Sequence, residues 1–547
     1  MSQQPIIILR EGTERTRGRD AQRNNIMAAI VIGETVKSAL GPKGMDKMLV
    51  DSFGDITVTN DGATILKEMD VVHPAAKMVI EVSKTVDQEV GDGTTTAAVL
   101  TGELLKKAEG LLDQNIHPTT IISGYRKAAK MAIDVIEEES ETVDPSSSGY
   151  KKLLIDAAKV AMSSKFVSAS SDHLAKIVVD AILLVSKDLA EGEDIDMNDL
   201  PRQKQQGMPA DETELVKGLV LDKEIVHPGM PKKIEQAKIA LIESALEVTK
   251  TEFDAKIQIT DPTAMQNFLD EEQRMLKSMV DKIVESGANV VIAQKGIDDV
   301  AQHYLAKNGI LAVRRIKKSD VERIHKATGA VIVSKIQNLT KADLGKAKIV
   351  EQRFVGEDKM LFIEGTAKSS VATLMVRGGT SHVVDEVDRA LNDALYVVRD
   401  IVIHPKITYG GGALASAIAT RLRKYASSLE GREQYAVNAF ADAAEVIPVT
   451  LAENAGLDPI DILVSLRSAH TEGKSTYGVD ITKGKVRDMK QTRIIEPALV
   501  SIQIIMSASE AAQMILKIDD VIASKGIGGM GGMGGPEGPG GEGFDDE

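Results

Sequence analysis

The sequence predicts a multidomain α and α/β protein, in which a block of strands and helices interrupts a mostly helical block. A chain of 547 residues is too long for one hydrophobic core, so about two to four domains are expected. Apolar residues recur at helical spacing near the start of the chain and again from 381 to 520, and strand-like runs lie between. We therefore expect the two helical parts to belong to one structural unit.

The first helical part is predicted to contain three amphipathic helices separated by glycine-containing loops. The first covers 20–40 and stops at the Gly-Pro breaker LGPKG. The second covers 75–90, and the pattern restarts over 97–111 after the loop GDGTTT. Between the first two, DITVTNDGATIL at 55–66 alternates like a strand that enters a tight Asn-Asp-Gly turn and leaves again, which predicts a hairpin.

Two breaks in composition precede the mixed block. Residues 142–152, TVDPSSSGYKK, are predicted to be a hinge or linker, and helical segments follow them. Residues 196–212, DMNDLPRQKQQGMPADE, are polar and resemble a disordered loop. The first helical part therefore ends near the first break.

The middle block is predicted to be α/β. Residues 218–250 contain strand-like runs, and a long helix is expected over 262–285, opened by Asp261 and Pro262. NVVIAQ, ILAVRR and AVIVSKI then alternate with helical segments as further strands. The chain ends in a low-complexity Gly/Met-rich tail at 526–547, expected to be flexible, where a G-x-G-x-x-G match lacks the strand and helix of a dinucleotide site.

Composition excludes several classes of function. There is no Cys, which excludes disulfides and thiolate chemistry, and the nine His residues form no HExxH motif. A formal net charge of −15, no Trp and 3% aromatic residues disfavour binding to nucleic acid. We expect no apolar run to be long enough for a membrane span, we recognise no signal peptide, and we expect a cytoplasmic protein.

The loop GDGTTT is the strongest candidate for a phosphate site. A helix N-terminus has unpaired N–H groups, Gly91 and Gly93 allow close approach of a ligand, and the three threonines add hydroxyls. The loop is not a Walker motif, because it has no lysine to neutralise phosphate charge. A divalent cation can do so instead, and Asp92 is a suitable oxygen ligand. The alternative is that Asp92 merely caps the helix that follows the loop, over 97–111.

Other candidates are weak when each is taken alone. LGPKG at 40–44, NDGAT with Asp61, and YGGGA at 409–413 are each more often simple turns, although together they suggest one site. Asp393 lies off the apolar stripe of its helix and could be a solvated partner of Arg389. Taken alone, Lys165 reads as a surface lysine, and Met265, Phe268 and Leu269 read either as core residues or as an exposed binding edge.

Several motifs together resemble the group II chaperonins (TCP-1/CCT-like family). They are LGPKGMDKMLV, TVTNDGATILKEMD, GDGTTTAAVL, VHPGMPKKIE, GANVVIAQKGIDDVAQHYLAKNGILAVRRIKKSD, AENAGLDP and SASEAAQMILKIDDVI, and the likeness covers about residues 8–525. The resemblance implies an equatorial ATP-binding domain at 1–146 and 405–525, an intermediate domain at 147–218 and 372–404, and an apical substrate-binding domain at 219–371 with a lid protrusion at about 250–282.

The resemblance also implies a nucleotide site for ATP/ADP with Mg²⁺. Asp92 would be the metal ligand, and Asp61 and Asp393 would orient or activate the attacking water. Lys165 would sense the γ-phosphate. The remaining implied contacts are Leu40, Gly41, Pro42, Gly93, Thr94, Thr95 and Thr96 around the phosphates, and Gly411, Gly412, Gly478, Asp480 and Glu496 on the nucleoside side.

This chain departs from the family pattern in two places on the nucleoside side of the implied site. After GGGA the family usually has Glu, but here Leu414 and Ala415 follow. The run after Glu496-Pro497, ALVSIQII, lacks the basic residues that the family has there. Neither departure touches the three acids.

The implied function is an ATP-hydrolysing folding chamber. Identical or homologous subunits would form two stacked rings, and ATP would close built-in lids around non-native client proteins. The alternative is an ATP-regulated holdase, or a structural ring or filament assembly with little folding activity. A small-molecule kinase is disfavoured, because the middle block has no recognisable acceptor pocket.

Overall fold

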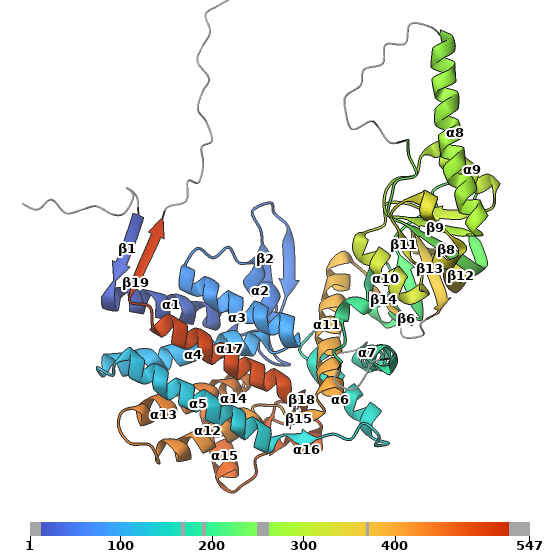
Figure 1. Ribbon diagram of the computed structural model, residues 1–547. Helices are drawn as coiled ribbons and strands as arrows, with labels where there is room; N and C mark the ends of the chain where they lie inside the picture. Colours follow the sequence, from blue (N-terminus) through green and yellow to red (C-terminus); the bar gives the residue numbers. More distant parts are fainter. Residues whose placement is uncertain (1–12, 166–169, 189–192, 249–261, 368–370, 525–547) are drawn as a thin grey trace, which may run out of the picture.

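The computed structural model describes residues 13–165, 170–188, 193–248, 262–367 and 371–524. It has three parts in a row: a broad helical block, a smaller middle part around the upright helix α11 (Ser381–Ile403), and an α/β block from which a long helix projects (Figure 1). The chain passes from the first part through the second to the third and then returns by the same route.

The helical block contains both ends of the described chain. Its first segment runs through β1 (Thr13–Arg17), α1 (Gly18–Lys37), β2 (Lys47–Val50), β3 (Ile56–Thr59), α2 (Gly62–Glu68), α3 (Pro74–Val90), α4 (Thr94–Asp113), α5 (Pro118–Glu139) and β4 (Glu141–Thr142). Its second segment runs through β15 (Lys406–Tyr409), α12 (Ala413–Ala426), α13 (Glu433–Ala444), α14 (Val446–Asn454), α15 (Pro459–Thr471), β16 (Tyr477–Asp480), β17 (Lys485–Asp488), α16 (Met489–Thr492), β18 (Ile495–Pro497), α17 (Ala498–Leu516) and β19 (Asp520–Ser524).

The two helical segments share one hydrophobic core. Tyr125 of α5 and Phe440 of α13 are fully buried and meet edge to face, with ring centroids 5.6 Å apart. The Tyr125 hydroxyl donates a hydrogen bond of 2.7 Å to the carbonyl of Leu104 on α4. The N- and C-terminal strands β1 and β19 pair antiparallel at the edge of the block (Figure 1). The helices expected at 20–40, 75–90 and 97–111 are confirmed as α1, α3 and α4.

Helix α17 corrects the expectation that no apolar segment is long enough for a membrane span. Ala498–Leu516 is long and apolar enough to cross a membrane by length and composition alone. In the structure it lies among α3, α4 and α5, with Ile504, Ala508 and Ile515 buried in the core (Figure 1). Burial on several sides explains why the helix is apolar around most of its circumference.

The hairpin expected at 55–66 is wrong in its second half. Strand β3 pairs with the preceding strand β2, and the chain then enters helix α2. Asp61 caps that helix: its carboxylate accepts hydrogen bonds from the backbone N–H of Thr64 at 2.9 Å and from the Thr64 hydroxyl at 2.7 Å. An Asn-Asp-Gly sequence suits a helix start as well as a turn, because the aspartate satisfies N–H groups of the first helical turn.

The middle part packs helices against a three-stranded sheet. Its elements are α6 (Tyr150–Met162), α7 (Ser171–Val185), β5 (Arg202–Gln206), β6 (Glu214–Val216), β14 (Thr373–Gly378) and α11, with short 3₁₀ turns at Ser186–Asp188, Met197–Asp199 and Ala210–Glu212. The disordered loop expected at 196–212 is therefore wrong, because β5 pairs parallel with β14. That pairing involves residues 172 positions apart and leaves no local signal in a polar strand such as RQKQQ.

The α/β block confirms the strands and the long helix expected for it. Its sheet has the order β10-β9-β8-β12-β13-β7, and β11 also pairs with β8. The elements are β7 (Gly218–Leu221), β8 (Lys233–Ile242), α8 (Pro262–Ser286), β9 (Val290–Ala293), α9 (Asp299–Lys307), β10 (Leu311–Val313), α10 (Lys318–Thr328), β11 (Ile332–Val333), β12 (Gly345–Val355) and β13 (Asp358–Thr366), with 3₁₀ turns at Ile336–Asn338 and Lys341–Asp343.

Helix α8 rises well beyond the sheet (Figure 1). Its inner turns pack on the sheet through Leu276, Val280 and Ile283, which are buried. Asp261, expected to open this helix, lies outside the described residues, as do the Gly/Met-rich tail and its glycine motif. The side chains of Met265, Phe268 and Leu269 also lie outside the described part, so their assignment to core or binding edge stays a prediction.

Candidate functional site

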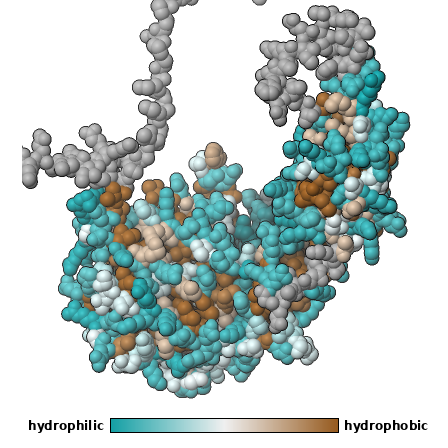
Figure 2. Space-filling view, in the orientation of Figure 1, coloured by the Kyte–Doolittle hydropathy of each residue, from teal (hydrophilic) through white to brown (hydrophobic). Residues whose placement is uncertain are grey.

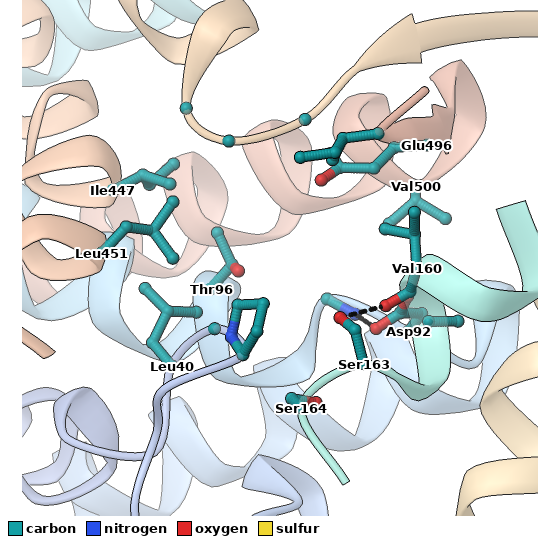
Figure 3. A pocket seen from close by; sticks show the side chains of 18 of the residues that line it. Leu40, Asp92, Thr96, Val160, Ser163, Ser164, Ile447, Leu451, Glu496 and Val500 are labelled. Carbon is teal, nitrogen blue, oxygen red and sulfur yellow. Dashed lines mark hydrogen bonds between the residues drawn. The ribbon is translucent and has the colours of Figure 1, made fainter. Parts of the chain in front are cut away.

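A cavity of about 1000 Å³ lies in the helical block where it meets α6 and α11 of the middle part (Figure 3). It is lined by the loops that the sequence singles out: 40–44, 60–64, GDGTTT and the glycines before α12. The predicted site residues among its lining are Leu40, Gly41, Pro42, Asp61, Asp92, Gly93, Thr94, Thr95, Thr96, Lys165, Asp393, Gly411, Gly412, Asp480 and Glu496. Residues that are up to 456 positions apart in sequence thus share one space.

The N-terminus of α4 forms part of the cavity wall. Gly93 precedes the helix with φ 79°, a left-handed conformation that L side chains rarely adopt. A side chain there would also meet Ile504 of α17, with the added Cβ only 2.5 Å from the Ile504 side chain. The threonines of the first helical turn follow directly, so their backbone N–H groups and hydroxyls provide donors suited to an anion.

Asp92 lies at the floor of the cavity below α6 (Figure 3). Its Oδ1 accepts a hydrogen bond of 2.6 Å from the N–H of Gly93, the next residue. The cap position of α4 is Gly93 itself, so Asp92 does not cap the helix in the usual way, through an N–H of its first turn. Burial raises the pKa of Asp92, and nearby Asp61 adds to this, while Gly93 and Lys165 oppose it. Burial of a carboxylate without a compensating charge is costly, so this position is suited to a bound cation.

Asp61 is held beside the first turn of α4. Gly62 follows it, and a Cβ at Gly62 would lie 2.8 Å from the Thr95 backbone, so only glycine lets α2 and α4 approach this closely. Burial by itself raises the pKa of Asp61, but the charge of Lys165 and the two hydrogen bonds from Thr64 outweigh it. The pKa of Asp61 is therefore lowered, and this acid stays ionised.

Lys165 and Asp393 form a buried ion pair, with Nζ 2.6 Å from Oδ2. Both side chains are almost inaccessible, at 4% and 11% exposure. The interpretations of Lys165 as a surface lysine and of Asp393 as a solvated partner of Arg389 are therefore wrong. Arg389 instead contacts Glu386 on its own helix, at 2.8 Å. A local pattern could not reveal the pair, because its members lie on separate segments of the middle part.

The pKa values of both members of the buried pair are raised, for different reasons. Burial works against the charge of Lys165, but Asp393 and Asp61 outweigh it, so the pKa of Lys165 is raised and the ammonium is retained. Burial raises the pKa of Asp393 well above its usual range, and only Lys165 opposes this, because Asp61 and Asp92 add to it. An acid with a raised pKa is a better proton acceptor than an ordinary aspartate once it is ionised.

Not all of the residues predicted for the nucleoside side of the site line the cavity. Gly478 is not among the described residues that line the cavity; it packs behind the glycine loop, where an added Cβ would lie 2.8 Å from the Gly411 carbonyl. Asp480 lines the cavity, but its Oδ1 accepts bonds from Thr482 and Lys483, and its Oδ2 accepts one of 3.0 Å from Arg487. Burial, together with the charge of Asp92, raises the pKa of Glu496 to about 7.

Sequence reasoning missed several residues of the cavity. One wall is apolar and is formed by Leu40, which the resemblance had already implied, with Ile447 and Leu451 of α14, which sequence reasoning missed (Figure 3). The opposite wall comes from α6, which contributes Asp156 and Val160 among others. The apolar residues gave no signal because they look like ordinary core positions of a helix.

The arrangement provides the parts that phosphoryl transfer needs. Anion-binding donors at the α4 N-terminus lie beside a carboxylate that can hold a cation, and two further acids and a lysine face the same space. Among the described residues, no preformed group of three or more metal-ligating side chains is present. Mg²⁺ usually takes one or two carboxylates from a protein and completes its shell with water and substrate phosphates.

Comparison with known proteins identifies the family. The sequence model of the TCP-1/cpn60 chaperonin family matches residues 32–526, which is nearly the whole chain. The chain belongs to this family. Among similar proteins, the thermosome subunit alpha of Archaeoglobus fulgidus is 56% identical over 523 residues, covering 96% of this chain and 95% of that protein. The thermosome subunit of Pyrococcus abyssi is 56% identical, covering 95% of this chain and 94% of its own length.

The relationship also holds at slightly lower identity. The thermosome subunit beta of Methanothermobacter thermautotrophicus is 53% identical over 527 residues, or 96% of both chains. The resemblance to group II chaperonins drawn from the sequence motifs is therefore confirmed, and the chaperonin is a chaperone subunit of that group.

Proposed function

We propose that the cavity of this chaperonin binds ATP with Mg²⁺ and hydrolyses it to ADP and phosphate. The observation that carries the proposal is the meeting of Asp61, Asp92, Asp393 and Lys165 beside the N-terminus of α4. Anion-binding N–H groups and cation-binding carboxylates within one cavity suit a nucleotide–metal complex better than either ligand alone.

Each of these residues has a distinct proposed role. Asp92 would hold the metal, which would supply positive charge close to the phosphates. Asp61 stays ionised and orients the attacking water, and Asp393 accepts its proton when ionised. Lys165 keeps its charge and would interact with the γ-phosphate of a bound nucleotide. The glycine loop before α12 and Glu496 contact the nucleoside.

We further propose that this chemistry drives a lid. The supporting feature is α8, which extends beyond the body of the α/β block (Figure 1). The proposed division of the chain is an equatorial domain at 1–146 and 405–525, an intermediate domain at 147–218 and 372–404, an apical domain at 219–371 with its protrusion at about 250–282, and a tail at 526–547. Non-native client proteins are the proposed substrates, in the cytoplasm. An ATP-regulated holdase is the alternative.

The test of the proposed activity is steady-state ATP hydrolysis by the full-length chaperonin, with Mg²⁺ and with EDTA in its place. We expect release of phosphate that requires Mg²⁺ and saturates with ATP. Activity that persists in EDTA, or no hydrolysis under any condition, would contradict the proposal. Electron microscopy with ATP analogues separates the two functions, because a folding chamber closes its lids with the nucleotide and a holdase does not.

Assembly into rings with further subunits is supported by an exposed apolar patch. The hairpin of β2 and β3 projects from the helical block (Figures 1 and 2). Met48 pairs across it with Val58 and Val50 with Ile56, so these four side chains share one exposed face. Phe53 at the turn is 91% exposed. Apolar side chains gathered on a two-stranded hairpin with open edges favour contact with another subunit.

Substitution of Phe53 by Asp should weaken this assembly without unfolding the subunit. We expect a larger fraction of free subunits by native mass measurement, because a charge replaces an aromatic ring in the proposed contact. Phe354→Asp is the matched control: Phe354 is 67% exposed but lies on the α/β block. Equal assembly by the two variants would exclude this hairpin from the contact.

A further inference from the structure

An ion pair between Asp156 and Arg493 joins α6 to the far side of the cavity. The Nε atom of Arg493 lies 3.0 Å from Oδ2 of Asp156, and both residues line the cavity. The Asp156 side chain is only 17% exposed, whereas that of Arg493 is 42% exposed. Asp156 comes from the middle part and Arg493 from the helical block, so the pair spans the boundary between them.

Arg493 stands at the start of the segment that holds the glycine loop. It ends α16 in a left-handed conformation with φ 60°, which is uncommon for a residue other than glycine. The next carbonyl, that of Ile494, accepts a hydrogen bond of 3.0 Å from the N–H of Gly410. Strand β18 follows, pairs with β15 and carries Glu496 into the cavity. A displacement of Arg493 would therefore be transmitted to the glycine loop before α12 and to Glu496, which are the proposed nucleoside contacts.

Helix α6 forms one wall of the cavity and is tied down near its other end as well. The Asn60 side chain donates a hydrogen bond to the carbonyl of Ser164, just after α6. Lys165, the next residue, contacts Asp393. These contacts involve the end of α6 next to Lys165, whereas Asp156 lies earlier on α6 and its partner Arg493 comes three residues before Glu496.

The pair lies beside hydrophobic packing between α6 and the helical block. Leu154 and Ala157, which flank Asp156 in sequence, belong to the same hydrophobic core as Met489 and Ile495 of the helical block. Lys159, one turn further on, is engaged by Asp172 of α7 and does not compete for Asp156. To this apolar packing the ion pair adds an electrostatic contact between two particular side chains.

We propose that the Asp156–Arg493 pair is a latch that holds α6 over the cavity and sets the rate at which nucleotide leaves. The inference rests on the proposed ATPase function and adds two positioning residues to it. Release of ADP requires α6 to move from the wall that it forms, and that motion separates Asp156 from Arg493. Hydrolysis itself takes place at the acids near the other end of α6, so the pair controls exchange more than chemistry.

The test is the dissociation rate of mant-ADP from the full-length chaperonin with Mg²⁺, measured by stopped-flow with excess ADP as chase. The variants are Asp156→Asn, Arg493→Gln and the double variant. Each single variant should release mant-ADP roughly two to five times faster than wild type, the range expected for a partly exposed ion pair. The double variant should be no faster than the singles, because the interaction is lost only once.

Lys151→Gln is the matched control. Lys151 lies on the same helix α6, and its substitution breaks an exposed ion pair of 2.6 Å with Asp180 of α7. It should release mant-ADP at the wild-type rate. Unchanged release from both single variants, or effects that multiply in the double variant, would overturn the latch. So would a loss of single-turnover hydrolysis as large as the change in release. If wild type binds no mant-ADP at all, the proposed function fails and the latch fails with it.

Discussion

Asp92→Ala should lower the kcat of Mg²⁺-dependent ATP hydrolysis by about 10²–10³ or more. The carboxylate is the proposed metal ligand at the floor of the cavity, and the loop around it has no lysine that could neutralise the phosphates in the way of a Walker motif. Asp92→Lys should not restore activity, because a lysine at this position cannot hold the metal ion that the carboxylate would hold. The measurement is phosphate release over a titration of Mg²⁺.

Asp92→Asn separates the metal role from a structural one. An asparagine oxygen can still accept the 2.6 Å hydrogen bond from Gly93, but it carries no charge for the cation. We expect weak activity that needs much more Mg²⁺, together with a thermal unfolding midpoint close to that of wild type. Full activity of Asp92→Ala or Asp92→Asn would return this residue to the role of holding the loop.

Asp393→Asn should slow hydrolysis by about 10²–10⁴ while ATP still binds. The side chain is buried against Lys165, and its proposed task is to accept the proton of the attacking water. Asparagine keeps the shape and an oxygen toward Lys165 but cannot take up a proton. Single-turnover hydrolysis and equilibrium nucleotide binding, measured on the same preparation, distinguish the two effects.

The proposed role of Asp393 as a base also predicts the direction in which the rate of hydrolysis changes with pH. Burial raises the pKa of Asp393 well above its usual range, and the group acts as a base only when deprotonated. Hydrolysis by wild type should therefore increase as pH rises through that raised pKa, and Asp393→Asn should lose this increase. Asp385→Asn, on an exposed position of the same helix, is the control and should behave like wild type. An unchanged pH profile in Asp393→Asn would exclude it as the base.

Local sequence patterns predicted the parts of the fold that depend on local physics. The spacing of apolar residues located α1, α3 and α4, and glycine-containing loops marked where they stop. The strands of the α/β block were recognised because buried strands are continuous apolar runs, such as VVIA at Val290–Ala293. GDGTTT was identified because the donors of a helix N-terminus and the glycines before it are neighbours in sequence.

The features that local sequence patterns did not predict depend on contacts between distant segments of the chain. Strand β5 is polar and exists through its pairing with β14, and the Lys165–Asp393 pair joins two separate segments. The motif resemblance brought Lys165 and Asp393 into the site where single-residue reasoning had placed both at the surface. The Asp156–Arg493 pair was missed altogether, since neither residue stands in a motif.

The most direct test of the account is the refolding of a denatured client protein by the full-length chaperonin with ATP and Mg²⁺, compared with the same mixture without ATP. The account predicts a higher yield of active client with ATP, and no such gain for Asp393→Asn under the same conditions. Equal yields with and without ATP would contradict a folding chamber driven by hydrolysis, and a gain retained by Asp393→Asn would separate folding from the proposed chemistry.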